Sequence, residues 1–308
     1  MLLFVSGRTD IPAFYSEWFF NRVKAGFLDV RNPFNNSAVS RYKLTPDLVD
    51  CLVFCTKNPA PMLSRLSEIQ NFGKYFFVTI TPYGRDIEPN VPEKSEVIKS
   101  FQELSKQLGK NCVCWRYDPI LVNEKYSVAF HIKAFRQMCS ELASYTDRCI
   151  ISFIELFEKV KRNFPEAREV SEADQKFLAG AFSSIAREYG ITVENCAGKT
   201  DLSAQGVIPA SCVSKDVIQK ATGKLLKDSG IQKIRENCLC LPMRDTGYYN
   251  SCPHLCRYCY ANYDEVLVSK TARQHDPSST FLIGGPEPGD KITISDQKSL
   301  RDFQPLLF

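Results

Sequence analysis

The sequence has neither a long apolar segment nor a strong net charge. Its N-terminal apolar run, from Met1 to Val5, is too short for a signal peptide, and no stretch is long enough to span a bilayer. We therefore expect a cytoplasmic protein with no membrane partner. The net charge of +4 permits a nucleic-acid or phosphate partner but does not indicate one. No Gly-x-Gly-x-x-Gly turn follows a predicted strand, so a dinucleotide-binding domain lacks its usual sequence support.

Cysteine, in contrast, is abundant. Thirteen cysteines in 308 residues, without a secretion signal, indicate metal or redox chemistry rather than a disulfide framework. Six lie in apolar, strand-like or helix-like stretches and are expected in the core: Cys51, Cys55, Cys112, Cys114, Cys139 and Cys149. The other seven fall in about the last third of the chain, mostly in loop-like sequence: Cys196, Cys212, Cys238, Cys240, Cys252, Cys256 and Cys259.

The first 200 residues alternate between strand-like and helix-like segments. Short apolar runs predict strands over residues 2–6, 28–30, 51–55, 75–80, 112–115, 149–153 and 191–194. Helices are predicted between most of them, over residues 13–24, 60–72, 94–108, 127–144 and 174–189. This alternation implies parallel strands joined by right-handed crossovers. It favours an α/β fold, a (β/α) TIM-type barrel, over an open doubly wound sheet.

The composition of the chain changes twice along its length. Residues 1–200 would form the body of the barrel. Residues 201–270 are a cysteine-rich segment that would complete the barrel and carry the iron–sulfur site, with helices predicted over 214–228 and from 260 to 264. Residues 271–308 are polar, contain Pro and Gly, and predict an irregular tail.

Polar side chains follow the predicted strands at the ends where barrel enzymes place their functional groups. Five of these strand ends have a proline nearby, which fixes the backbone and ends the strand. A solvated turn explains any single one equally well, but seven similar strand ends indicate a site. The candidate catalytic residues in these loops are Arg8, Asp10, Asn32, Asn58, Arg116, Asp118 and Glu155.

Three cysteines near the end of the chain, Cys252, Cys256 and Cys259, have a C-x3-C-x2-C spacing. Thiolates are the soft ligands of iron–sulfur clusters, and a loop this short can offer three sulfurs to three irons of a cubane. The fourth iron is then either closed by another cysteine or open to a substrate or cofactor. Zinc is less favoured because it prefers paired C-x2-C knuckles, and three purely structural thiols within eight residues are rare.

Five short motifs follow the predicted strands: SGRTDIPA at 6–13, RNPF at 31–34, TKNP at 56–59, TPYG at 81–84 and WRYDP at 115–119. Together with the cysteine loop (residues 252–259) they resemble the DUF1848 family over nearly the whole chain. That family has no assigned biochemical function, and its C-terminal cysteine cluster is similar to the N-terminal cluster of radical S-adenosylmethionine (SAM) enzymes. Their C-x3-C-x-aromatic-C signature is matched here, with Tyr258 in the aromatic position. The resemblance supports an iron–sulfur barrel and supplies no substrate.

The cluster loop of radical SAM enzymes follows the first strand, whereas this loop comes last. Because the first and last strands of a closed barrel are neighbours, we expect a circularly permuted barrel in which residues 238–250 supply the strand before the loop. SAM would bind the open iron, with Tyr258 and Asn262 in the cofactor site. A cluster reduced by a donor such as ferredoxin or flavodoxin would cleave SAM to a 5′-deoxyadenosyl radical. Residues 284–288 (GGPEP) resemble the glycine-rich SAM-binding stretch, although such a sequence more often forms a turn.

The other late cysteines leave several roles open. A second 4Fe–4S cluster, a structural zinc site and closure of the first cluster are all compatible with Cys196, Cys212, Cys238 and Cys240. Two alternatives to a radical enzyme also stay open. One is an iron–sulfur barrel that moves electrons or acts as a Lewis acid without SAM. The other is a metal-stabilised module that binds nucleic acid through tyrosines interleaved with basic residues, which the modest net charge disfavours.

Overall fold

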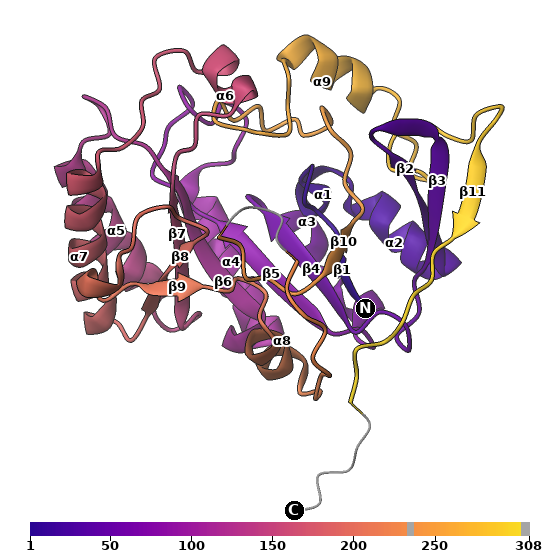
Figure 1. Ribbon diagram of the computed structural model, residues 1–308, viewed down its shortest axis with the longest axis horizontal. Helices are drawn as coiled ribbons and strands as arrows, with labels where there is room; N and C mark the ends of the chain where they lie inside the picture. The colour runs from indigo at the N-terminus through magenta and orange to yellow at the C-terminus, as the bar shows by residue number, and fades with distance from the viewer. Residues whose placement is uncertain (233–236, 303–308) are drawn as a thin grey trace, which may run out of the picture.

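The computed structural model describes residues 1–232 and 237–302, and its centre is one sheet of eight parallel strands (Figure 1). The strand order is β10-β1-β4-β5-β6-β7-β8-β9. The strands are β1 (Leu2–Phe4), β4 (Cys51–Thr56), β5 (Lys74–Thr79), β6 (Val113–Ile120), β7 (Arg148–Phe153), β8 (Thr192–Cys196), β9 (Ile208–Ala210) and β10 (Met243–Asp245). The predicted α/β fold with parallel strands is confirmed.

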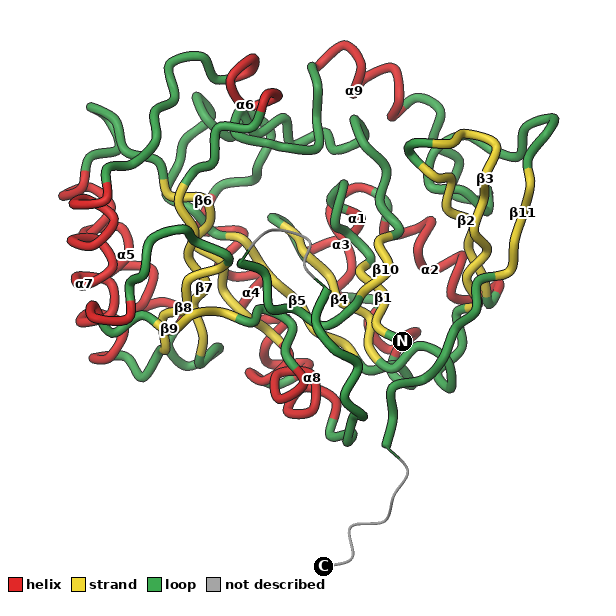
Figure 2. Tube along the Cα trace, viewed as in Figure 1, coloured by secondary structure: helices red, strands yellow, loops and turns green. Residues whose placement is uncertain are grey.

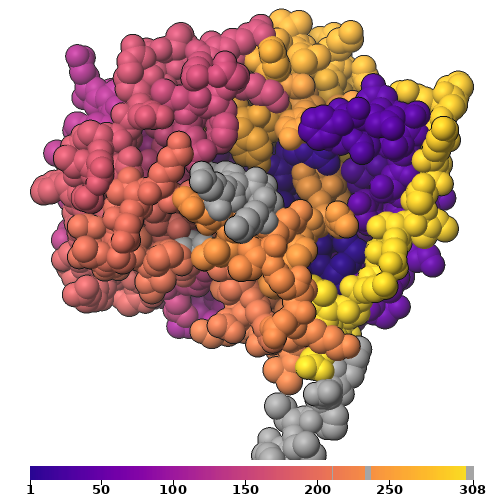
Figure 3. All heavy atoms as spheres, in the orientation of Figure 1, coloured from indigo at the N-terminus to yellow at the C-terminus, as the bar shows by residue number. Residues whose placement is uncertain are grey.

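The described residues do not form the closed barrel that we expected. The edge strands β9 and β10 do not pair with each other, and each has only three residues. The described parts of the chain between them cross one face of the sheet, called the inner face below, where Val213, Ile218 and Leu241 pack. Figure 3 shows this covering segment in orange over the front of the molecule. A TIM barrel is filled by side chains of its own strands, whereas a separate segment fills the inner face here.

Different partners bury the two faces of the sheet. Alternate strand residues, such as Phe54, Phe76 and Trp115, belong to the larger core on the outer face. Four helices pack into that core: α2 (Ser16–Ala25), α4 (Lys94–Leu108), α5 (Val128–Leu142) and α7 (Glu172–Glu188). The intervening strand residues, such as Val53 and Cys114, pack on the inner face with α8 (Lys215–Thr222). Burial on both sides explains why these strands are apolar at nearly every position.

Helix bounds agree with the prediction where the local signals are strong. α4 has its predicted bounds because Val97 and Leu104 lie on one buried face, and Gly109, with a φ of 86°, follows as the C-cap. The helix predicted over 13–24 is instead broken at Tyr15 into α1 (Ile11–Phe14) and α2. The helix predicted over 60–72 is reduced to α3 (Ala60–Leu63) and the 3-10 turn η1 (Leu66–Ile69).

The segment predicted as the second barrel strand lies outside the main sheet. It forms β2 (Phe27–Asn32), which pairs antiparallel with β3 (Asn35–Lys43) in a three-stranded sheet completed by β11 (Lys291–Ile294). The reason is the short turn at Pro33 and Phe34, which reverses the chain instead of starting a crossover helix. The tail predicted as irregular therefore contributes a strand. Its later residues return to the start of the sheet, where the Leu300 N–H donates to Asp50 at 2.7 Å.

Loops at the carboxyl ends of the main strands gather on one side of the molecule, together with α6 (Glu158–Asn163) and α9 (Glu265–Ala272) (Figure 2). The helix predicted from 260 begins later because Asp264 caps α9, accepting from the Leu267 N–H at 2.7 Å. Two 3-10 turns, η2 (Lys110–Cys112) and η3 (Ser203–Gln205), complete the elements. No helix within the described ranges is long and apolar enough to cross a membrane.

Candidate functional site

The cysteine loop follows β10, a strand that forms within the predicted segment 238–250. β10 pairs in parallel with β1, with Phe4 opposite Asp245. The loop then reaches the chain that follows β5. There the Arg257 N–H donates to the Ile87 carbonyl at 3.0 Å, and a second backbone hydrogen bond joins residues 90 and 254 at 3.3 Å. The three cysteines therefore lie at the carboxyl edge of the sheet, where the polar strand-end residues also gather.

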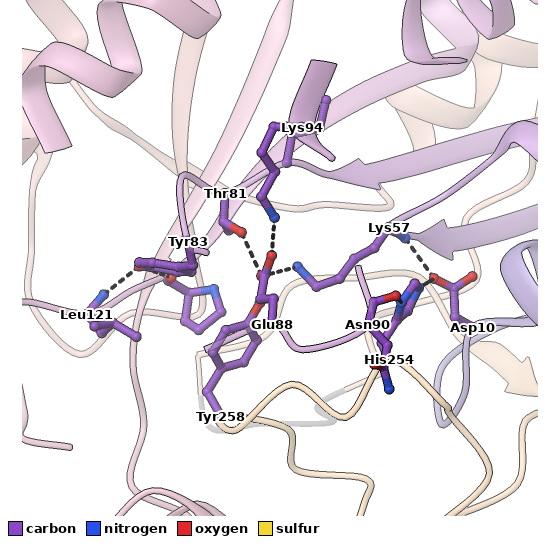
Figure 4. A network of polar contacts seen from close by, with 12 residues as sticks. Asp10, Lys57, Thr81, Tyr83, Glu88, Asn90, Lys94, Leu121, His254 and Tyr258 are labelled. Atoms are coloured by element: carbon purple, nitrogen blue, oxygen red, sulfur yellow. Dashed lines mark hydrogen bonds and ion pairs between the residues drawn. The ribbon is translucent and has the colours of Figure 1, made fainter. Parts of the chain in front are cut away.

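Asp10 ties the cysteine loop to two strand ends (Figure 4). Its Oδ2 accepts from the backbone N–H of Lys57, directly after β4, at 2.7 Å and lies 2.9 Å from His254 Nε2. Its Oδ1 accepts from the Ala13 N–H at 3.0 Å and so caps α1. Both oxygens are engaged and the side chain is buried. Asp10, a predicted catalytic residue, is thus placed as a positioning group for the loop.

Glu88 holds the same loop from the side of β5, and it was not among the predicted site residues. Its buried carboxylate is bonded to Lys57 Nζ at 2.7 Å and Thr81 Oγ1 at 2.6 Å, and makes short contacts with Lys94 and the Tyr258 hydroxyl (Figure 4). Burial opposes its ionisation, but the two ammonium groups lower the pKa of Glu88 to about 2. One carboxylate between two lysines leaves a net positive group beside the loop.

The three thiols of the loop lie near one another. Cys256 is buried, whereas Cys252 and Cys259 are partly exposed. Burial, the charge of Asp10 and the neighbouring thiols raise the pKa of Cys252 well above its ordinary value. Burial also raises the pKa of Cys256 and Cys259, while Lys57 acts in the opposite direction on both. A positive group near the sulfurs favours the thiolate form that metal binding needs.

Within residues 1–232 and 237–302, no three His, Cys, Asp or Glu side chains are arranged so that they could hold a metal ion. A 4Fe–4S cluster makes a different demand, because its thiolates bind separate irons and their sulfurs need not converge on one point. The surroundings of the loop suit a bound group. Asn262 Nδ2 donates to the Cys252 carbonyl at 2.8 Å, while its buried Oδ1 has no hydrogen-bond partner in the described part of the chain. That oxygen is an acceptor available to a ligand.

Arg116 and Asp118 occupy the inner face of β6. They form an ion pair at 2.6 Å, and Asp118 also accepts a hydrogen bond from the Ser152 hydroxyl on β7. Arg116 Nη1 lies 3.8 Å from the sulfur of Cys55 on β4. Its buried Nε has no hydrogen-bond partner among the described residues. The pair is therefore a partly buried polar group at the carboxyl half of the sheet, and among the described residues the guanidinium Nε has no acceptor.

The remaining predicted residues are spread over the same edge, with one exception. Arg8 Nε bonds to Asp245, at the end of β10, at 2.6 Å. Glu155 follows β7, and Asn58 follows β4 and accepts from the backbone of its own turn. Asn32 is exposed on β2 and bonds within the hairpin turn, so its predicted place beside the others was wrong. The reason is again that β2 belongs to the smaller sheet.

The GGPEP stretch, and three site residues that were not predicted, can also be placed. The GGPEP stretch lies against the smaller sheet, where the Gly285 carbonyl accepts from Arg31 at 3.1 Å. Glu88 and Lys94 were not predicted as site residues, because charges in a loop and in the first turn of a helix are usually solvated. His254 was also missed. Its place inside the cysteine motif was a usable signal.

Comparison with known proteins gives a family and no activity. No curated protein matches the chain. Three solved chains match, among them a "putative alpha-L-fucosidase" from Bacteroides thetaiotaomicron, with 13% identity, 52% of this chain covered and a TM-score of 0.27. The match spans 47% of that protein's length, and so low a score supports no argument. The family described as a domain of unknown function, DUF1848, matches residues 2–261, and the chain therefore belongs to the DUF1848 family.

Proposed function

We propose that the cysteine loop holds a 4Fe–4S cluster whose fourth iron is open to SAM, and that the protein is a radical SAM-like enzyme with a circularly permuted chain. One observation carries the proposal. The three thiols follow β10, and β10 is the parallel neighbour of β1. In space, the order is therefore strand, cysteine loop and then the strand that begins the chain, as a permutation of the radical SAM order requires. The substrate would be a small molecule or a macromolecule.

The residues around the loop have separate tasks in this proposal. Asp10 orients the loop through His254, and Glu88 orients it through Tyr258. Glu88 neutralises one of the charges of Lys57 and Lys94, and the remaining positive charge would offset part of the charge of three thiolates and so lower the cost of holding them in a buried site. The unpartnered Oδ1 of Asn262 would accept a hydrogen bond from the SAM amino group, as its predicted place in the cofactor site suggests.

A cluster held by Cys252, Cys256 and Cys259 would supply the electron for reductive cleavage of SAM, and this cleavage would provide the radical chemistry by which a hydrogen atom is taken from the substrate. The protein's own part is to hold the reactants close and to exclude water. The Arg116–Asp118 pair is suited to orient a polar substrate group, because the guanidinium retains a free buried N–H. A reduced ferredoxin or flavodoxin would deliver the electron.

A second candidate function rests on Cys55. This cysteine ends the inner-face row of β4 and is partly exposed near Arg116. If Cys55 bound the fourth iron, the cluster would be closed, and the protein would be an electron-transfer protein that does not use SAM. The nucleic-acid alternative has less support, because Lys159 lies over the Tyr249 ring at 4.6 Å and Arg162 over the Tyr263 ring at 4.8 Å. These aromatic and basic groups already engage one another within the chain.

The test is anaerobic reconstitution with iron and sulfide, followed by metal analysis and incubation with SAM and a chemical reductant. We expect about four irons in the wild type, their loss in a variant with Ala at 252, 256 and 259, and release of 5′-deoxyadenosine. Cys139→Ala, at a buried cysteine in α5, is the matched control and should keep the iron. If the wild type bound four irons without cleaving SAM, and the Cys55→Ser variant did cleave SAM, the closed cluster would be supported instead. No iron in the wild type would refute both.

A further inference from the structure

Four late cysteines outside the cysteine loop meet on the inner face of the sheet. They come from three separated segments: the end of β8, the chain after β9, and the chain before β10. All four are buried and belong to the same inner-face core: Cys196, Cys212, Cys238 and Cys240. Buried cysteines scattered through a core need not touch one another, so their convergence requires an explanation.

Backbone hydrogen bonds fix the register of these segments. The Leu241 N–H donates to the Val213 carbonyl at 2.9 Å, and the Ser211 hydroxyl donates to the Leu239 carbonyl at 2.7 Å. These two bonds flank Cys212 and Cys240 and hold them opposite each other. On the other side, the Asn237 amide donates to the carbonyl of residue 198 at 3.2 Å, which brings the chain around Cys238 to the end of β8.

The thiols themselves are linked in a row. The thiol of Cys212 interacts with those of Cys196 and Cys240, and Cys240 interacts in turn with Cys238. The Cys240 sulfur also accepts from the backbone N–H groups of Val213 and Cys212. N–H groups directed at a cysteine sulfur stabilise a thiolate, which is the form that binds a metal.

We propose a closed structural zinc site formed by four thiolates, those of Cys196, Cys212, Cys238 and Cys240. Structural zinc sites take four protein ligands and leave no open position. With Zn–S bonds of about 2.3 Å, tetrahedral geometry puts the sulfurs only about 3.8 Å apart. Sulfurs that touch one another suit a single ion better than a cubane, in which each thiolate binds a different iron. No three of these side chains converge on one point among the described residues, so the four thiols would have to move together to enclose the ion, and each bound thiol would release its proton.

The position of the proposed zinc site indicates what it would stabilise. It joins the segment that covers the inner face to the β8–β9 edge of the sheet. Cys196 and Cys212 also lie close enough to Arg116 for their charges to act on its guanidinium. The zinc site would therefore hold the segment beside the Arg116–Asp118 pair in place. The positive charge of Arg116 would in turn favour the thiolate form of the two cysteines. This inference is independent of the proposed cluster, because it uses none of the three loop cysteines.

The experiment separates the two sites by metal analysis. The variant with Ala at 252, 256 and 259, purified anaerobically from medium containing zinc and iron, should retain about one zinc per chain, with an X-ray absorption shell of four sulfurs at about 2.3 Å. Adding Cys212→Ser and Cys240→Ser should abolish the zinc, whereas adding Cys139→Ser should not. If the double substitution prevents folding, the single Cys238→Ser substitution replaces it in the test. The Cys238→Ser variant should weaken zinc retention at least tenfold.

Two results would overturn the zinc site. One is a folded loop-cysteine variant that contains no metal. The other is iron with inorganic sulfide in place of zinc, which would identify a second cluster. If the wild type formed no cluster on the loop cysteines, the zinc content of the loop-cysteine variant would be unaffected. Failure of the proposed cluster can therefore be told from failure of the zinc site.

Discussion

Replacing Glu88 by glutamine tests whether the buried charge network supports the cysteine loop. The Glu88 carboxylate is completely buried, and its partners Lys57 and Lys94 are 12% and 24% exposed. Removing one member of a buried ion pair costs about 3–5 kcal/mol, because the remaining charges stay buried without a counter-charge. The pKa of Glu88, lowered from its ordinary value of 4.5 to about 2, leads to a similar figure of about 3 kcal/mol. Domains of this kind have total stabilities of about 5–15 kcal/mol, so the loss would be large.

The assay is urea unfolding at pH 7.5 of the reconstituted protein, followed by circular dichroism, with iron retention measured after gel filtration. The matched control is Glu93→Gln, which breaks the exposed Arg85–Glu93 pair, with side chains 77% and 69% exposed. Such surface pairs contribute about 0–1 kcal/mol. We expect Glu88→Gln to lower the free energy of unfolding by at least 3 kcal/mol more than the control and to reduce iron retention. Equal stabilities and iron contents in the two variants would refute the role assigned to Glu88.

Three further predictions use other parts of the structure. Asp10→Asn should lose iron and about 1–3 kcal/mol of stability because one of its oxygens can no longer accept, whereas Asp201→Asn, at an exposed turn that caps Ser203, should behave as wild type in the same assays. Gly73→Ala should lower the melting temperature because the added Cβ would lie 2.3 Å from the Asp50 carbonyl oxygen. Gly285→Ala is the control and should leave the melting temperature unchanged, because an added Cβ there has no neighbour within 4 Å. Equal melting temperatures of the two variants would contradict this packing. Burial lowers the pKa of His131 to about 4, so the stability that its neutral form contributes is complete above pH 6.5 and is lost as the pH falls toward 4. Between pH 7.5 and pH 5 the free energy of unfolding of the wild type should therefore fall by about 2 kcal/mol more than that of His131→Gln. Parallel pH profiles of the two proteins would contradict a buried neutral histidine.

The sequence predicted those parts of the fold that rest on local patterns. α4 and the central strands were found because apolar periodicity and a terminal glycine mark them directly. β2 was assigned to the wrong sheet, because the three-residue pattern Leu28-Asp29-Val30 indicates a strand but not its partner. β3 and β11 were missed for the same reason: strand pairing depends on residues far apart in the chain.

The candidate site shows the same division. The three loop cysteines and the strand before them could be predicted because spacing and chain order carry that information. Glu88 could not, because its partners Lys57, Lys94 and Tyr258 come together only in space. Asn32 was misplaced with β2. The row of four inner-face thiols was visible only as a list of late cysteines, and hydrogen bonds between three separate segments were needed to join them.

The most direct test of the central claim is the electron paramagnetic resonance spectrum of the reduced, reconstituted protein with and without SAM. An open fourth iron predicts a cluster signal whose g values shift when SAM is added, and the same shift should occur in the Cys55→Ser variant. A cluster signal that SAM leaves unchanged would contradict the open site, and with it the radical SAM-like function.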